Sequence, residues 1–152
     1  LGRWYVFYHR LTHASDYSRQ ACAEPIKIND DSSICQVEIS SSGLEAKPLP
    51  ASGIYPAVIA CNITNGRMPH ISNRRYNGNI PKITDCRGER YIADIDRRTA
   101  VCYKWFDFVS DIGEIILDID SRADGKIVVF ANRIPIASAA ITPCGRSKII
   151  MQ

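Results

Sequence analysis

The residues of this 152-residue sequence that could break a phosphodiester bond are histidine, glutamate and arginine. His70 lies in a long stretch without periodicity, and Glu89 lies between Arg87 and Arg90. A histidine acid, a glutamate base and an arginine that holds phosphate are the groups a ribonuclease requires. Because the chain has three equally eligible histidines, these residues define no particular site, and the sequence has no Gly-x-Ser-x-Gly nucleophile motif. We therefore expect a protein that is not an enzyme and has no catalytic residue, with a small secreted ribonuclease as an alternative.

The two tryptophans, Trp4 and Trp105, are the residues that could bind a sugar. Carbohydrate sites combine an exposed aromatic ring with neighbouring amides and carboxylates. The stretch 125–136 resembles one hairpin of a jelly-roll, an architecture that lectins use. Trp105 stands among further aromatic residues at 103–108, where packing is its more ordinary role. A lectin-like carbohydrate-binding module is thus a second alternative.

The six cysteines predict disulfide bonds rather than a metal centre. They are Cys22, Cys35, Cys61, Cys86, Cys102 and Cys144. No Cys-x-x-Cys pair occurs and no histidine stands at zinc-ligand spacing, whereas an even number of dispersed cysteines is typical of three bridges formed in an oxidising compartment. We expect a secreted, extracellular protein, and a start at Leu1 is what removal of a leader would leave. Asn62 begins a glycosylation sequon, Asn-Ile-Thr.

Three aspartates, Asp118, Asp120 and Asp124, faintly resemble a calcium loop. The spacing is wrong for that loop, Arg122 intrudes, and the bidentate glutamate is missing. We expect no metal and no cofactor. Because the sequence has no apolar run of about 18 residues, we also expect no stable membrane insertion.

Composition and pattern predict an all-β fold. The sequence holds 22 Ile and 7 Val against 5 Leu, and β-branched side chains suit strands better than helices. A single domain over residues 1–152 is expected, as a compact antiparallel β-barrel or β-sandwich stabilised by the disulfides. Residues 14–24 could hold at most one short helix, and the chain turns at 96–98, 123–125 and 132–133. The eight or nine short strands are expected at 3–12, 34–40, 57–64, 91–95, 99–109, 114–120, 126–131, 134–141 and 147–151.

Charge is distributed unevenly along the chain. Residues 67–104 hold nine Lys or Arg and four Asp or Glu, whereas residues 105–131 hold two and six. A basic loop at 66–82 and an arginine pair at 97–98 could contact acidic protein surfaces, but the patch is not dense enough to predict a nucleic-acid partner. Ordered arginines and tyrosines provide large contact areas and directional hydrogen bonds. The residues expected to bind a partner are Arg67, His70, Arg74, Arg75, Tyr76, Arg97 and Arg98.

The start at Leu1-Gly2-Arg3, the six dispersed cysteines, the isoleucine-rich all-β pattern and the lack of a catalytic signature together resemble one class of protein. The sequence is similar to cysteine-rich secreted effectors of plant-pathogenic fungi, in particular the host-selective necrotrophic toxins. That resemblance implies a non-enzymatic effector that binds host proteins, either a susceptibility receptor or a secreted defence protein. It further implies a monomer that triggers a host cell-death response.

Overall fold

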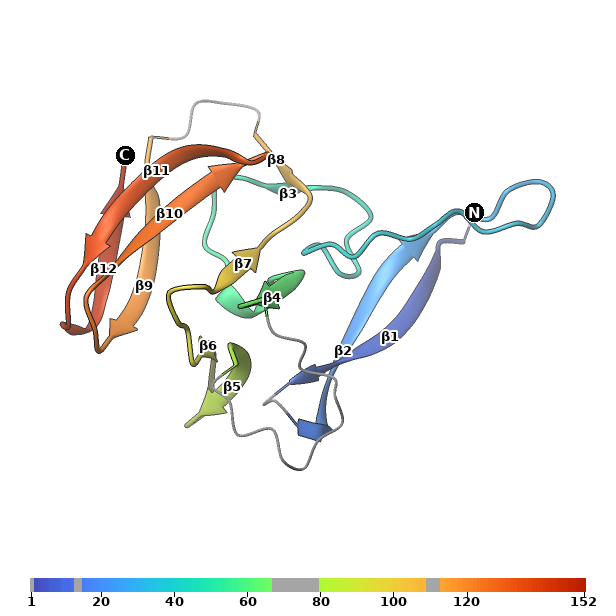
Figure 1. The fold of residues 1–152 in the computed structure, drawn as a ribbon. Coiled ribbons are helices and arrows are strands. Elements are labelled where there is room, and N and C mark those ends of the chain that lie inside the picture. Colours follow the sequence, from blue (N-terminus) through green and yellow to red (C-terminus); the bar gives the residue numbers. More distant parts are fainter. Residues whose placement is uncertain (1, 13–14, 67–79, 109–112) are drawn as a thin grey trace. The chain divides into compact units, whose positions relative to one another are not determined.

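The computed structural model describes residues 2–12, 15–66, 80–108 and 113–152 (Figure 1). Its regular elements in these ranges are β-strands and one 3-10 turn, η1 (Ala57–Ile59), so the all-β prediction is confirmed. No helix in the described ranges is long and apolar enough to cross a membrane. The chain divides into two compact units, Leu1–Asp107 and Phe108–Gln152. Each unit is described by itself, and the expectation of a single domain stays a prediction.

The first unit begins with a long antiparallel hairpin formed by β1 (Trp4–Thr12) and β2 (Ser15–Ile26). The register places Trp4 opposite Ile26, and it shifts after Leu11. The short helix allowed at 14–24 is not formed over the described residues 15–24, because Ser15 and residues 19–24 pair with β1 instead. The aromatic and β-branched side chains of β1 suit a pleated surface, and β1 supplies β2 with a backbone partner despite the weaker strand preference of residues 21–24.

Short strand pairs make up the rest of this unit. β3 (Leu49–Pro50) runs parallel to β8 (Phe106–Asp107), β4 (Asn62–Thr64) pairs antiparallel with β7 (Ala100–Cys102), and β5 (Lys82–Cys86) pairs antiparallel with β6 (Glu89–Ala93). The expected hairpin between 91–95 and 99–109 is wrong, because these segments take other partners. The expected strand at 34–40 is reduced to an isolated bridge between Ile34 and Ile28.

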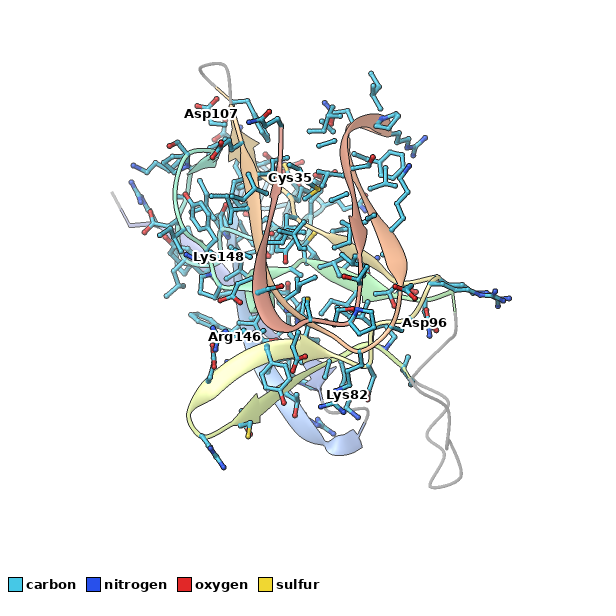
Figure 2. All side chains as sticks on the ribbon, turned by 90° about the vertical axis from the view of Figure 1, so that its left-hand side faces the viewer. Cys35, Lys82, Asp96, Asp107, Arg146 and Lys148 are labelled. Carbon is cyan, nitrogen blue, oxygen red and sulfur yellow. The ribbon has the colours of Figure 1, made fainter. Side chains whose placement is uncertain are left out.

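The described residues of the second unit form four strands: β9 (Ile115–Ser121), β10 (Gly125–Ala131), β11 (Ile134–Ile141) and β12 (Gly145–Met151). β9 pairs with β12, and β10 pairs with β11, both antiparallel. Burial alternates along these strands, so each has one covered face and one exposed face. Arg146, which is labelled in Figure 2, lies on β12. Its Nη2 lies 2.9 Å from the carboxylate of Asp118 on β9. The expected hairpin of 114–120 with 126–131 is therefore wrong.

The described strands form six two-stranded sheets and no closed barrel, so the barrel expectation is wrong. The buried apolar residues of the described chain are few: Val58, Ala60, Ile80 and Ile83 in the first unit, and Met151 in the second. All six cysteines carry free thiols in this structure. Stabilisation by disulfides is therefore not shown, and the disulfide framework stays a prediction.

Candidate functional site

The expected partner-binding surface lies mostly outside the described residues. Arg67, His70, Arg74, Arg75 and Tyr76 all fall in the stretch 67–79. Arg97 and Arg98 are described, and both are exposed in the turn before β7. The Arg98 N–H donates to the Asp96 carboxylate at 2.8 Å, which fixes this turn. A surface that combines the loop with the arginine pair stays a prediction.

Cys61 and Cys102 are neighbours at the end of the β4–β7 pair. The Cys61 N–H donates to the Cys102 carbonyl at 2.8 Å, and the Cys61 thiol contacts the same carbonyl oxygen at 3.3 Å. Burial raises the pKa of the Cys61 thiol, and the nearby Cys102 raises it further. The register pairs Cys102 with the exposed Asn62, which places the sequon asparagine and Cys102 on one face of the pair.

The backbone of Trp105 has an unusual conformation. Its φ is +70°, in the left-handed region, which is costly for a residue with a bulky side chain. Its neighbours hold it there: the Leu49 N–H donates to the Trp105 carbonyl at 2.8 Å. Ser41 and Lys104 also exchange two hydrogen bonds, from the Ser41 N–H to the Lys104 carbonyl and from the Lys104 N–H to the Ser41 hydroxyl, both at 3.1 Å. Backbone strain of this kind persists where surrounding structure fixes it, and it often marks a functional position.

Trp105 lines an open cavity of about 250 Å³ in the first unit. Trp105 as a whole is 37% exposed, so this lining residue is not shielded from solvent. The wall contains two carboxylates, one amide, one ammonium group and several apolar side chains. These residues are Glu24, Pro25, Ile26, Lys27, Cys35, Gln36, Val37, Glu38 and Trp105.

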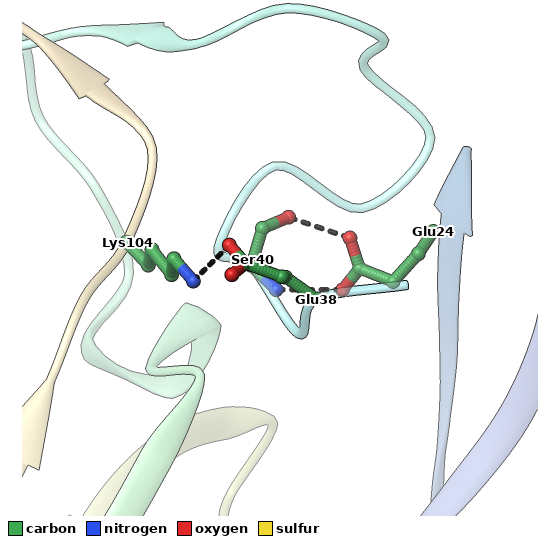
Figure 3. A network of polar contacts seen from close by, with 4 residues as sticks. All are labelled: Glu24, Glu38, Ser40 and Lys104. Atoms are coloured by element: carbon green, nitrogen blue, oxygen red, sulfur yellow. Dashed lines mark hydrogen bonds and ion pairs between the residues drawn. The ribbon is translucent and has the colours of Figure 1, made fainter. Parts of the chain in front are cut away.

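Glu24 is the most buried side chain of this wall, at 2% exposed. One of its oxygens accepts the Ser40 N–H at 2.8 Å, and the other accepts the Ser40 hydroxyl at 2.6 Å (Figure 3). The first oxygen also accepts the Tyr8 hydroxyl at 3.2 Å. Burial raises the pKa of Tyr8, and the Cys22 and Glu24 charges raise it further. Glu24 thus fastens β2 to the segment that carries Ser40.

Glu38 occupies a different environment on the same wall. Its carboxylate pairs with the Lys104 ammonium group, and both side chains are substantially exposed (Figure 3). Lys104 precedes Trp105 directly, so this ion pair connects the segment of Gln36 and Glu38 to the tryptophan. An exposed ion pair of this kind contributes little to stability.

The wall has the groups needed to bind a sugar. An accessible indole can cover the apolar face of a sugar ring, while Gln36, Glu38 and Lys27 can exchange hydrogen bonds with its hydroxyl groups. Glycoside hydrolysis itself uses a pair of carboxyl groups, one on each side of the scissile bond. Glu24 is unsuited to that role, because both of its oxygens are taken by Ser40 and Tyr8. Glu24 and Glu38 therefore do not form a hydrolytic pair here.

Trp105 is the one residue of this wall that the sequence indicated as a possible sugar platform, and Cys35, also on the wall, was expected in a disulfide. Gln36 and Glu38 were missed as site residues because they come from a segment far from Trp105 in the sequence. The strand expected at 34–40 would place both on one face, but the structure forms no strand over 35–40, and residues 35–38 all line the wall. Within the described ranges, no group of three or more His, Cys, Asp or Glu could hold a metal ion.

Comparisons with known proteins give one informative likeness. The chain is 41% identical over 114 residues to a xylosidase/arabinosidase of Thermoclostridium stercorarium, a bacterium. The match covers 70% of this chain and 24% of that relative, so the chain spans about a quarter of the relative's length. No protein-family model matches the sequence, and no solved structure matches the chain.

This likeness corrects one expectation from the sequence. The expectation that the protein is not an enzyme is wrong, because the relative is named as a glycosidase. The sequence alone was misleading because the chain lacks a local catalytic motif. The catalytic motif of a glycosidase need not lie in the quarter of the relative that this chain matches. Secretion, a host-protein partner, cell-death activity and resemblance to fungal effectors are not tested by this likeness, and they stay predictions.

Proposed function

We propose that this chain is part of a glycosidase acting on glycans that contain xylose or arabinose, and that the cavity beside Trp105 holds a sugar unit of the substrate. The observation that carries the proposal is the left-handed backbone of Trp105, which presents the indole to a wall of amide, carboxylate and ammonium groups. The likeness to a xylosidase/arabinosidase supports the choice of sugar.

The arrangement suits recognition of a sugar in three ways. Trp105 provides a rigid apolar surface, because hydrogen bonds on both sides fix its backbone. Gln36 and Glu38 provide polar groups at its edge, and the buried Glu24–Ser40 bonds keep their segment in place. Such pre-ordering lowers the entropic cost of binding.

Binding to xylotetraose and to an arabinose oligosaccharide, measured by calorimetry, tests the proposed site. Replacing Trp105 with Ala should weaken binding of the preferred oligosaccharide at least about tenfold, because the stacking surface is lost. Phe130→Ala is the matched control, since Phe130 is an exposed aromatic residue of the second unit and lies outside the cavity. If neither oligosaccharide binds the chain, or if Trp105→Ala binds as the unaltered chain does, the proposed site is wrong.

A second variant separates loss of the ring from loss of the fold. Trp105→Gly also removes the ring, but glycine adopts positive φ without steric cost. We expect Trp105→Gly to be more stable than Trp105→Ala by about 1 kcal/mol, while both fail to bind. Binding by the glycine variant would show that the indole is not the contact surface.

Hydrolysis is tested separately with nitrophenyl xyloside and nitrophenyl arabinoside on the protein in its full length. Release of nitrophenol from either compound supports the glycosidase assignment. Failure to cleave both, by a protein that still binds the oligosaccharide, would restrict the function to glycan binding.

A further inference from the structure

A second cavity, of about 340 Å³, lies beside the first in the same unit. The two cavities share three consecutive wall residues, Pro25, Ile26 and Lys27. Trp4 lines this second cavity, and the residue is 63% exposed. Each cavity therefore has one accessible tryptophan, and both cavities border the same end of β2.

The charges of the two walls differ. The first cavity is lined by two carboxylates and one ammonium group, from Glu24, Glu38 and Lys27. The second is lined by two cationic side chains, Arg3 and Lys27, and by no carboxylate. Its residues are Gly2, Arg3, Trp4, Pro25, Ile26, Lys27, Ile28 and Ala46.

The side chains of Arg3 and Lys27 make no hydrogen bond or ion pair with any other residue in the part of the chain that the structure describes. Their surroundings are nevertheless ordered. The Cys35 N–H donates to the Lys27 carbonyl at 3.3 Å, next to the bridge between Ile28 and Ile34. The Tyr5 hydroxyl donates to the Leu44 carbonyl at 3.0 Å, which holds the segment of Ala46 against β1.

We propose that the second cavity binds a sugar that carries a carboxylate, a uronic acid, as a branch or neighbour of the sugar beside Trp105. The inference rests on the proposed function for its glycan. Arginine matches the planar geometry of a carboxylate with two parallel N–H donors, and lysine adds a point charge. The indole of Trp4 covers the apolar face of the same ring, so the wall fits a group that is apolar on one face and anionic at its edge.

The test compares two probes on the intact 152-residue chain by calorimetry. One probe is xylotetraose, and the other is xylotetraose with a single glucuronic acid branch. We expect the acidic probe to bind about tenfold more tightly at low salt, as one charge-assisted interaction would supply. The preference should shrink between about 0.01 M and about 1 M salt, because the Debye length falls from about 30 Å to about 3 Å.

Variants of Arg3 and Lys27 test whether the second cavity causes the preference for the acidic probe. Arg3→Gln and Lys27→Gln should each bring the ratio of the affinities for the acidic and the neutral probe closer to one. Arg3→Gln should leave the affinity for the neutral probe unchanged. Arg122→Gln, an exposed arginine of the second unit, is the control and should keep the preference. Equal affinity of the unaltered chain for the two probes, or a preference that survives in both glutamine variants, overturns the proposal.

The outcomes also separate this proposal from the proposed function. Binding of neutral xylotetraose that depends on Trp105 but shows no acidic preference refutes only the uronic acid site. Binding of the acidic probe that depends on Arg3 but not on Trp105 refutes the sugar site of the first cavity. The uronic acid site of the second cavity is then still supported. Failure of both probes to bind refutes both.

Discussion

The Glu24 carboxylate is buried without a cation among its hydrogen-bonded neighbours in the described structure. Three donors satisfy it instead: the Ser40 N–H, the Ser40 hydroxyl and the Tyr8 hydroxyl. Burial of a charge is tolerated only where hydrogen bonds replace the lost water. Losing any one donor therefore loosens the link between β2 and the segment at 40–42.

Tyr8 makes this link dependent on pH. Its pKa is raised above the ordinary value by burial and by nearby Cys22 and Glu24, so the folded protein keeps the hydroxyl proton that the unfolded chain releases near pH 10. The stabilisation is fully present below pH 10 and is lost as pH rises toward the raised folded value. Urea unfolding at several pH values should show the unfolding free energy falling above about pH 10.

Tyr8→Phe should reduce that alkaline loss, because phenylalanine has no proton to release. The pKa of Tyr103 is also raised by burial. Tyr103→Phe is therefore a comparison that removes the contribution of a different tyrosine to the alkaline loss of stability. An identical alkaline decline in Tyr8→Phe and the unaltered chain would contradict the assignment.

Trp105 shows what the sequence could predict about single residues. The indole was a sugar-platform candidate by residue type alone, and local aromatic composition favoured packing. Its backbone has a positive φ, and the hydrogen bonds that surround it, from Leu49 to Trp105 and from Ser41 to Lys104, come from residues far away in the sequence. No pattern among the residues next to Trp105 in the sequence predicts this backbone conformation.

The turn between β10 and β11 is an element whose conformation does follow from its own residues. Asn132 and Arg133 both have positive φ, +48° and +72°, and connect paired residues Ala131 and Ile134. Two positive φ values define the hairpin turn whose twist matches that of the strands, and Asn-Gly is its preferred sequence. Asparagine fits the first position well, whereas arginine is strained at the second.

Arg133→Gly should therefore stabilise the second unit by about 0.5–1 kcal/mol, since relief of strain outweighs the added freedom of glycine in the unfolded chain. The measurement is urea unfolding at neutral pH. Arg122→Gly is the matched control: Arg122 lies in the turn after β9, has no positive φ, and should lose stability or show no gain. A gain of the same size in both variants would mean that the turn geometry is not responsible.

Strand positions in the second unit were predictable from the sequence, but the strand partners were not. Alternating isoleucines indicated the segments of β9, β10, β11 and β12 to within a few residues. A turn at 123–125 suggested that β9 pairs with β10, whereas β9 pairs with β12 and β10 with β11. Pairing depends on which side-chain faces can be buried together, and that is decided by segments far apart in the chain.

At the scale of the whole molecule, the division into two units separates the two cavities from the β9–β12 strands. Every residue that lines either cavity belongs to the first unit. Composition was sufficient to predict an all-β chain. It could not predict a glycan-related function, because the relevant groups are few and come from separated segments.

Hydrogen exchange followed by mass spectrometry tests this separation. With xylotetraose bound, we expect slower exchange at residues 24–27, 35–38 and 104–106, and unchanged exchange over 113–152, because binding orders only the segments it contacts. Trp105→Ala under the same conditions provides the control without binding. Protection that is strongest in the second unit would place the sugar site there.

The left-handed backbone of Trp105 also constrains how this sequence can diverge. Gly, Asn and Asp are the residues that fit such a backbone at low cost, and none of them has an aromatic ring. Selection for stable folding therefore favours a small residue at position 105, whereas selection for ligand contact favours tryptophan. In descendants that no longer use the ring, we expect glycine or asparagine to replace it, so the residue found here would report whether the pocket is still under selection.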